Sequence, residues 1–261
     1  FLIWILFQRL QDLGIFLAVI GFPVIIWLSV YLVRDCSIKE RNQTLVMLIL
    51  MAFSVFFWAL FEQAASSITL FTDRNVNFGP VFSAGMFQAL NPFFIVILAP
   101  FFASLWVVLG KRNLDPTPGY KFALAILCVG LGFMSLVLGE NFADENYKVH
   151  VFFLIVMYLL HTIGELCLSP VGLSMVTKLS IPRIAGLMMG VWFLSSSLAG
   201  YVSGIIAGMM AISENEAGVK TGAENSLNTY ISSFEHLAYL AILVAIILVI
   251  LTPIMKKYLK V

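Results

Sequence analysis

Hydrophobic residues in this chain occur in long blocks that are separated by short polar connections. Each block meets the length of about 20 residues that a membrane-spanning helix needs. The blocks at 44–70 and 149–178 are longer than an upright helix requires, so we expect these two helices to tilt or break. The predicted spans are 1–33, 44–70, 86–110, 120–140, 149–178, 184–212 and 233–258.

Basic residues are concentrated in every second connection between the predicted spans. Lys and Arg in short loops favour the cytoplasmic side of a membrane, which gives each span a direction. The chain is therefore expected to begin outside and to end with its C-terminus in the cytoplasm. The connections at 34–43, 111–121 and 178–183 are predicted to be cytoplasmic, and those at 71–85, 141–148 and 213–232 to lie outside.

The composition agrees with a chain that lies mostly in a lipid bilayer. Of the 261 residues, 61% are hydrophobic and 11% are charged, and the mean hydropathy is +1.00. The formal net charge of +1 excludes nucleic acid as a partner, because such binding needs a strongly basic surface. The 3 cysteines are widely spaced, so neither a disulfide framework nor a cysteine metal site is predicted. The chain begins at Phe1, without Met, and we expect it to be part of a longer protein.

Two glutamates lie near the middle of the long spans at 44–70 and 149–178. Glu62 belongs to the stretch VFFWALFEQAASS, and Glu165 belongs to HTIGELCLSPVG. An acidic side chain in a membrane interior costs several kcal/mol, so it normally faces the inside of a helix bundle or a water-filled cavity. Both glutamates are therefore expected to be buried and functional, although a carboxylate held by a neighbouring helix can also serve packing alone.

Helical spacing places further polar side chains beside both glutamates, because residues at i, i+4 and i+8 share one helix face. Pro170 is expected to weaken or kink the helix that carries Glu165, since proline lacks a backbone donor. Gln88 and Asn91 precede Pro92 and are expected near the outer end of the third span. The predicted polar faces are Trp58, Glu62 and Ser66; His161, Glu165 and Ser169; and Trp192, Ser196 and Gly200.

The order of the spans indicates an internal symmetry. Without the first span, six remain, and they form two triplets that enter the membrane from opposite sides. Each triplet begins with a span that carries one of the two glutamates. This arrangement is typical of an inverted three-plus-three repeat, as in one half of a major facilitator transporter, where substrate binds near the membrane midplane.

Several motifs, in order along the chain, resemble the C-terminal half of the proton-dependent oligopeptide transporter family. The resemblance implies an all-α membrane protein with seven transmembrane helices. Residues 1–43 would be an accessory helix and its cytoplasmic connection, and residues 44–261 the C-terminal six-helix bundle. The motifs are FWALFEQ (57–63), QALNPFFI (88–95), KRNLDPTPGYKFALA (111–125), GELCLSPVGLSMVTKLSIPR (164–183) and GLMMGVWFLSSSLAGY (186–201).

The resemblance also assigns roles to residues. Glu165 would meet the amino terminus of a bound peptide, with Asn91 beside it and Ser169 one turn further along. Glu62 would bind the coupling proton, because desolvation without a fixed cation in its own helix favours the protonated form. The positions that would line the peptide pocket are Trp58, Gln88, Trp192, Phe193 and Ser196.

The implied activity is symport of protons with di- and tripeptides across a bacterial inner membrane. The protein would not be an enzyme and would need no cofactor other than the proton as coupling ion. The basic residues that hold the peptide carboxyl terminus belong to an N-terminal six-helix half in this family, and that half is not found in this sequence.

Three alternatives remain open on the sequence. A major facilitator transporter for nitrate or another small solute is the closest one, although an acidic pocket disfavours anions. A seven-span receptor would have the same topology, but the sequence lacks a DRY-like triplet after the third span and an NPxxY pattern near the last. An intramembrane metalloenzyme could be built on His161 and Glu165, but a third convergent ligand is not evident.

Overall fold

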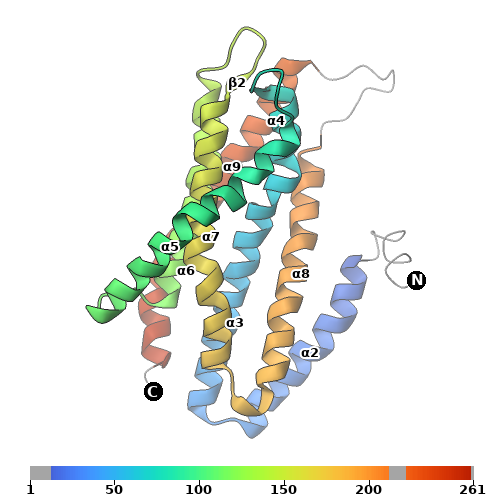
Figure 1. Ribbon diagram of the computed structural model, residues 1–261. Helices are drawn as coiled ribbons and strands as arrows, with labels where there is room; N and C mark the ends of the chain where they lie inside the picture. The colour runs from blue at the N-terminus through green and yellow to red at the C-terminus, as the bar shows by residue number, and fades with distance from the viewer. Residues whose placement is uncertain (1–12, 212–221, 260–261) are drawn as a thin grey trace.

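The computed structural model describes residues 13–211 and 222–259 (Figure 1). Within these residues 7 helices are long and apolar enough to cross a membrane, as predicted from the hydrophobic blocks. They are α2 (Leu13–Asp35); α3 (Ile38–Phe61), followed by the 3-10 turn η2 (Glu62–Ala65) and α4 (Ser67–Asn75); η3 (Ala84–Ala89) with α5 (Leu90–Lys111); α6 (Pro118–Glu140); α7 (Val151–Leu179); η4 (Pro182–Ile184) with α8 (Ala185–Met209); and α9 (Ala223–Leu259).

The helices pair as an inverted repeat requires. With α2 left aside, α3, α5 and α6 form the first triplet, and α7, α8 and α9 form the second. Helix α3 packs against α8, and the equivalent contact of the other triplet, between α7 and α5, is also present. The third helices, α6 and α9, pack extensively on each other. The predicted symmetry of the spans is therefore present in the tertiary structure.

Close contacts between helix backbones hold α6 in the middle of the bundle. A Cβ atom on Gly130 of α6 would stand 3.0 Å from the Cβ of Ala241 of α9. A Cβ atom on Gly164 of α7 would stand 2.8 Å from the backbone oxygen of Ala125. Glycine at these positions lets neighbouring helices approach closely, which is a common way to pack helices in a membrane.

A small set of polar contacts ties the connections together at the end of the bundle where Figure 1 shows β2 and α4. The strands β1 (Val76–Asn77) and β2 (Val149–His150) pair in parallel. Beside them, the buried Asn75 donates to the backbone oxygens of Tyr147 at 3.1 Å and Ala223 at 2.9 Å. Ser226 donates to the side-chain oxygen of Asn75 at 2.7 Å. These bonds explain why α9 begins ten residues before the predicted start at 233.

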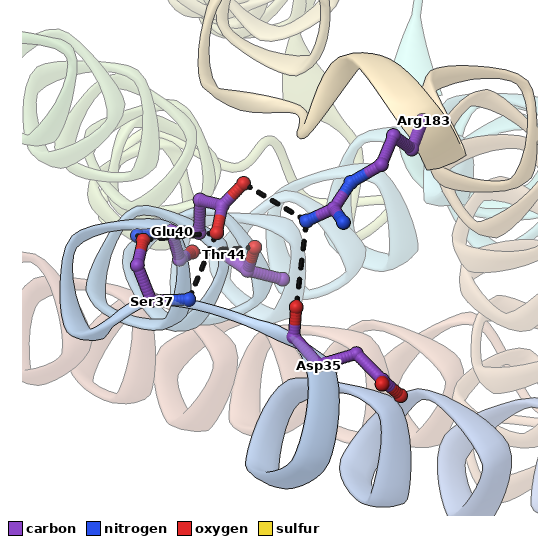
Figure 2. A network of polar contacts seen from close by, with 5 residues as sticks. All are labelled: Asp35, Ser37, Glu40, Thr44 and Arg183. Atoms are coloured by element: carbon purple, nitrogen blue, oxygen red, sulfur yellow. Dashed lines mark hydrogen bonds and ion pairs between the residues drawn. The ribbon is translucent and has the colours of Figure 1, made fainter.

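At the opposite end of the bundle, where α2 ends in Figure 1, polar contacts join α2 to α3 and η4 (Figure 2). Arg183 of η4 donates to the carboxylate of Glu40 at 3.2 Å and to the backbone oxygen of Asp35 at 3.4 Å. Ser37 and Glu40 form a reciprocal capping box at the start of α3. Arg41 donates to the backbone oxygen of Leu32 at 3.2 Å. Arginine side chains thus satisfy carbonyl groups that the C-terminus of α2 would otherwise leave unpaired.

Candidate substrate-binding site

The site lies where the second membrane-spanning helix changes direction. Helix α3 ends at Phe61, the 3-10 turn Glu62–Ala65 follows, and Ser66 links it to α4 with φ −125° and ψ −94°. The break that the length of this span predicted is therefore present. The single polar face expected for Trp58, Glu62 and Ser66 is wrong, because helical spacing does not continue beyond Glu62. Helix α7 runs without interruption through Pro170, so the second long span does not break.

The break is stabilised by a buried glutamine. Gln63 is fully buried, and its amide nitrogen lies 3.1 Å from the backbone oxygen of Ala59 and 3.0 Å from the hydroxyl of Ser203 on α8. Ser67, at the start of α4, donates to the amide oxygen of Gln63 at 2.9 Å. The side chain thus replaces backbone hydrogen bonds that the break removes, and the segment is fixed against α8.

A carboxylate and an amide meet between α5 and α7, which cross obliquely in Figure 1. The side-chain nitrogen of Asn91 donates to Oε2 of Glu165 at 2.8 Å and lies 3.1 Å from the hydroxyl of Thr162. Asn91 can reach across because it lies in the first turn of α5, where Pro92 needs no backbone donor. Asn91 and Glu165 were predicted as neighbours from the resemblance, whereas Thr162 was not predicted; its i, i+3 spacing to Glu165 is the signal that indicates it.

The two glutamates have different surroundings. Glu165 is half-buried and is held by Asn91. Glu62 is exposed on the surface of this chain, so the expectation that it is buried is wrong. Its Oε2 lies 3.5 Å from the position that a Cβ atom on Gly200 of α8 would occupy. In the described part of the chain, neither glutamate forms an ion pair with a basic side chain.

The remaining predicted site residues are distributed over four elements. Trp58 packs edge-on against Phe61, with ring centroids 5.3 Å apart. Gln88 of η3 donates to the hydroxyl of Thr69 at 2.9 Å. Trp192 of α8 is buried against Gly172 of α7, where a Cβ atom would stand 2.5 Å from its ring. The exposed residues among these are Gln88, Ser169, Phe193 and Ser196.

A cavity of about 130 Å³ lies next to Asn91. It brings together the end of α3, the 3-10 turns η2 and η3, the start of α5 and the first half of α7. Its polar walls include the side-chain amides of Gln88 and Asn91. Two of the predicted site residues therefore line the same cavity. The lining residues are Phe61, Ala64, Ala65, Gln88, Asn91, Tyr158 and His161.

Within the described residues, no cluster of three or more His, Cys, Asp or Glu side chains could hold a metal ion. His161 and Glu165, from which a metal site could be argued, therefore lack a third ligand in this part of the chain. Glu165 is bound to an amide instead, and the chemistry available to it is the binding of a hydrogen-bond donor or a cation.

The seven spanning helices of the described residues and the inverted pairing of six of them define a multi-pass membrane protein with a major facilitator type of fold. The chain belongs to the POT family, whose sequence pattern matches residues 7–227. This membership confirms the resemblance that the five motifs indicated. It also sets aside the seven-span receptor.

Curated bacterial relatives of this chain are named as peptide permeases or peptide transporters. The chain is 30% identical to the dipeptide and tripeptide permease B of Aliivibrio fischeri over 258 residues, which are 97% of this chain and 51% of the relative. It is 39% identical to the peptide transporter YePEPT of Yersinia enterocolitica over 178 residues, which are 66% of this chain and 35% of the relative. The chain thus spans about half the length of the permease and a smaller part of YePEPT.

Solved structures agree on the fold. A crystal structure of the peptide transporter POT in complex with sulfate superposes with a TM-score of 0.75 at 30% identity, and covers 100% of this chain and 51% of the transporter. A mutant of peptide transporter POT in complex with alafosfalin gives a TM-score of 0.75 at 30% identity, with 98% and 51% covered.

Proposed function

We propose that the complete protein to which this chain belongs is a proton-coupled symporter of di- and tripeptides, and that this chain binds the amino-terminal side of the peptide. The observation that carries the proposal is the bond between Asn91 and Glu165, which fixes a half-buried carboxylate between two helices. The names of the relatives, which are peptide permeases and transporters, support peptides as the substrate class.

The surroundings of Glu165 suit a cationic substrate. Asn91 is a neutral donor, so it orients the carboxylate through Oε2 without neutralising its charge. A partly desolvated carboxylate recovers much of its desolvation cost when an ammonium group binds it, and charge-assisted hydrogen bonds of this kind are strong. The same negative charge disfavours nitrate and other anions at this position.

Glu62 is proposed to carry the coupling proton. Its carboxylate makes no hydrogen bond or ion pair within residues 13–211 and 222–259, so it is free to exchange a proton during the transport cycle. No cofactor is proposed besides the proton. The pocket around the peptide would be lined by Trp58, Gln88, Ser169, Trp192, Phe193 and Ser196, several of which are exposed on this chain.

The proposed partner of this chain is an N-terminal six-helix half, which would supply the basic residues for the peptide carboxyl terminus. The exposed Glu62, Phe193 and Ser196 would then face that half across the substrate pathway. The division of this chain into an accessory helix at 1–43 and a bundle at 44–261 remains a prediction. The proposed location is a bacterial inner membrane with the C-terminus in the cytoplasm, in agreement with the basic connections.

Uptake of a labelled dipeptide into liposomes that contain the complete protein tests the proposal. An inward proton gradient is expected to drive accumulation by the wild type. Glu165→Gln is expected to lower uptake by two orders of magnitude or more, since losing one partner of a buried charge pair costs about 3–5 kcal/mol. Glu145→Gln, which changes an exposed loop residue, is the matched control and should transport normally. Wild-type liposomes that never accumulate peptide would contradict the proposal.

A further inference from the structure

One buried titratable side chain next to the proposed site has no role in the proposed function. His161 lies on α7 one turn before Glu165, and only 1% of its surface is exposed. Its Nε2 atom lies 3.3 Å from the backbone oxygen of Val129. Because a carbonyl oxygen can only accept, Nε2 carries the hydrogen, and Nδ1 is then an acceptor with a free lone pair. No donor among the described residues reaches Nδ1.

The imidazole ring is held in this orientation by its neighbours. Phe133 packs edge-on against it with ring centroids 5.2 Å apart, and the ring of Phe61 lies 6.0 Å away on a different helix. A Cβ atom on Gly132 would stand only 2.7 Å from Nε2, so glycine at this position leaves just enough room for the ring. The ring therefore cannot turn to find another partner for Nδ1, and a buried acceptor without a donor is costly.

His161 lines the cavity of about 130 Å³ that Asn91 also borders. An engineered cavity of about 150 Å³ in another protein accommodates benzene, so a volume of this order can take an amino-acid side chain. The walls from Phe61, Ala64 and Ala65 are apolar, while His161, Gln88 and Asn91 are polar. Asn91 belongs both to this cavity and to the pair with Glu165, which places the cavity directly beside the proposed ammonium site.

We propose that this cavity receives the side chain of the first residue of the peptide, and that His161 accepts a hydrogen bond from a hydroxyl group on that side chain. Peptides that begin with Thr or Ser are then preferred over peptides of the same shape without a hydroxyl. The inference rests on the proposed function, because Glu165 must hold the amino terminus for the first side chain to enter here. A water molecule is the other possible donor to Nδ1, and it would produce no such preference.

Competition between two isosteric dipeptides tests the inference. Thr-Ala has a hydroxyl group where Val-Ala has a methyl group. Each dipeptide would be tested as a competitor of labelled Ala-Ala uptake by the complete protein in liposomes. In the wild type, Thr-Ala is expected to inhibit at an about fivefold lower concentration, the ratio that one additional hydrogen bond gives. His161→Phe should abolish this preference, and His161→Asn, which keeps an acceptor, should restore part of it. His236→Phe, an exposed position on α9, is the control and should keep the preference.

The possible results separate the two proposals. Equal inhibition by Thr-Ala and Val-Ala in the wild type, with normal Ala-Ala uptake, would overturn the inference and leave peptide transport intact. A preference that persists in His161→Phe would also overturn it. The wild-type comparison decides the matter by itself if His161→Phe fails to fold, because it needs no variant. Failure of the wild type to take up Ala-Ala would overturn the proposed function and the inference with it.

Discussion

Gln63 and Ser203, which are 140 residues apart in the sequence, are joined inside the bundle by a hydrogen bond of 3.0 Å from the amide of Gln63 to the hydroxyl of Ser203. The bond links the break after α3 to α8, the helix that also approaches Glu62 at Gly200. The direction of the Glu62 side chain therefore depends on how the break is held against α8.

Replacing Gln63 is expected to destabilise the bundle at the break. Gln63→Leu keeps the volume of the side chain but leaves the hydroxyls of Ser67 and Ser203 without their partner. Unsatisfied buried groups cost about 1–3 kcal/mol each, so thermal unfolding in detergent should occur at a clearly lower temperature. Ser203→Ala should have a smaller effect, because the backbone oxygen of Ser203 still accepts from Gln63 at 3.1 Å. Equal unfolding temperatures of Gln63→Leu and wild type would refute this interpretation.

Loss of the amide of Asn91 is expected to weaken peptide binding more than it weakens the fold. Asn91→Ala removes the donor that orients Glu165 and exposes the carboxylate to other partners. A hydrogen bond to a charged group contributes about 1.5–3 kcal/mol, so the KM for a dipeptide should rise tenfold or more. Asn228→Ala, at an exposed position on α9, should leave KM unchanged. An unchanged KM in Asn91→Ala would show that peptide binding does not need Asn91 to orient the carboxylate of Glu165.

Glu62→Gln is expected to separate proton coupling from peptide binding. The neutral side chain keeps the shape of Glu62 but cannot release a proton, so accumulation against a peptide gradient should be lost. Exchange of labelled for unlabelled peptide at equal concentrations needs no net proton movement and should continue. Counterflow and gradient-driven uptake measured on the same liposomes provide the comparison. Normal accumulation by Glu62→Gln would mean that another group carries the proton.

The close contact between Gly132 and His161 leads to a prediction about thermal stability. Gly132→Ala forces a Cβ atom against the imidazole ring, and overpacking of this kind costs about 1–3 kcal/mol. Gly204→Ala on α8 is the matched control, because a Cβ atom there meets nothing within 4 Å. The unfolding temperature should fall for the first variant and stay equal or rise for the second. Similar temperatures for both variants would argue against the ring position described for His161.

Arg183 is expected to hold the accessory helix without adding much global stability. Its bond to Glu40 is solvent-exposed, and such pairs contribute about 0–1 kcal/mol. Arg183→Gln should therefore leave the unfolding temperature almost unchanged, while trypsin should cleave faster after Arg34, at the end of α2. Lys178→Gln removes an exposed charge nearby and should not change the cleavage rate. A large drop in unfolding temperature would contradict this local role.

The sequence alone determined the spans, their order and the family. A span is a local property, since a helix must be long and apolar enough to satisfy its backbone within the bilayer. The positions of Gln88 and Asn91 at the start of the third membrane helix also followed from a local signal, because Pro92 is favoured in a first helical turn.

The tertiary structure decided which polar side chains meet. Asn91 and Glu165 lie 74 residues apart and pair only because α5 crosses α7 at that height. The break at Glu62 was predicted from length, but its geometry depends on Gln63 reaching α8, and this geometry brought Glu62 to the surface. The acceptor on His161 was identified only from the contact between its Nε2 atom and the backbone oxygen of Val129 on α6. These features depend on how the helices pack against one another. The hydrophobic pattern of the sequence does not determine which residues of two packed helices lie at the same height.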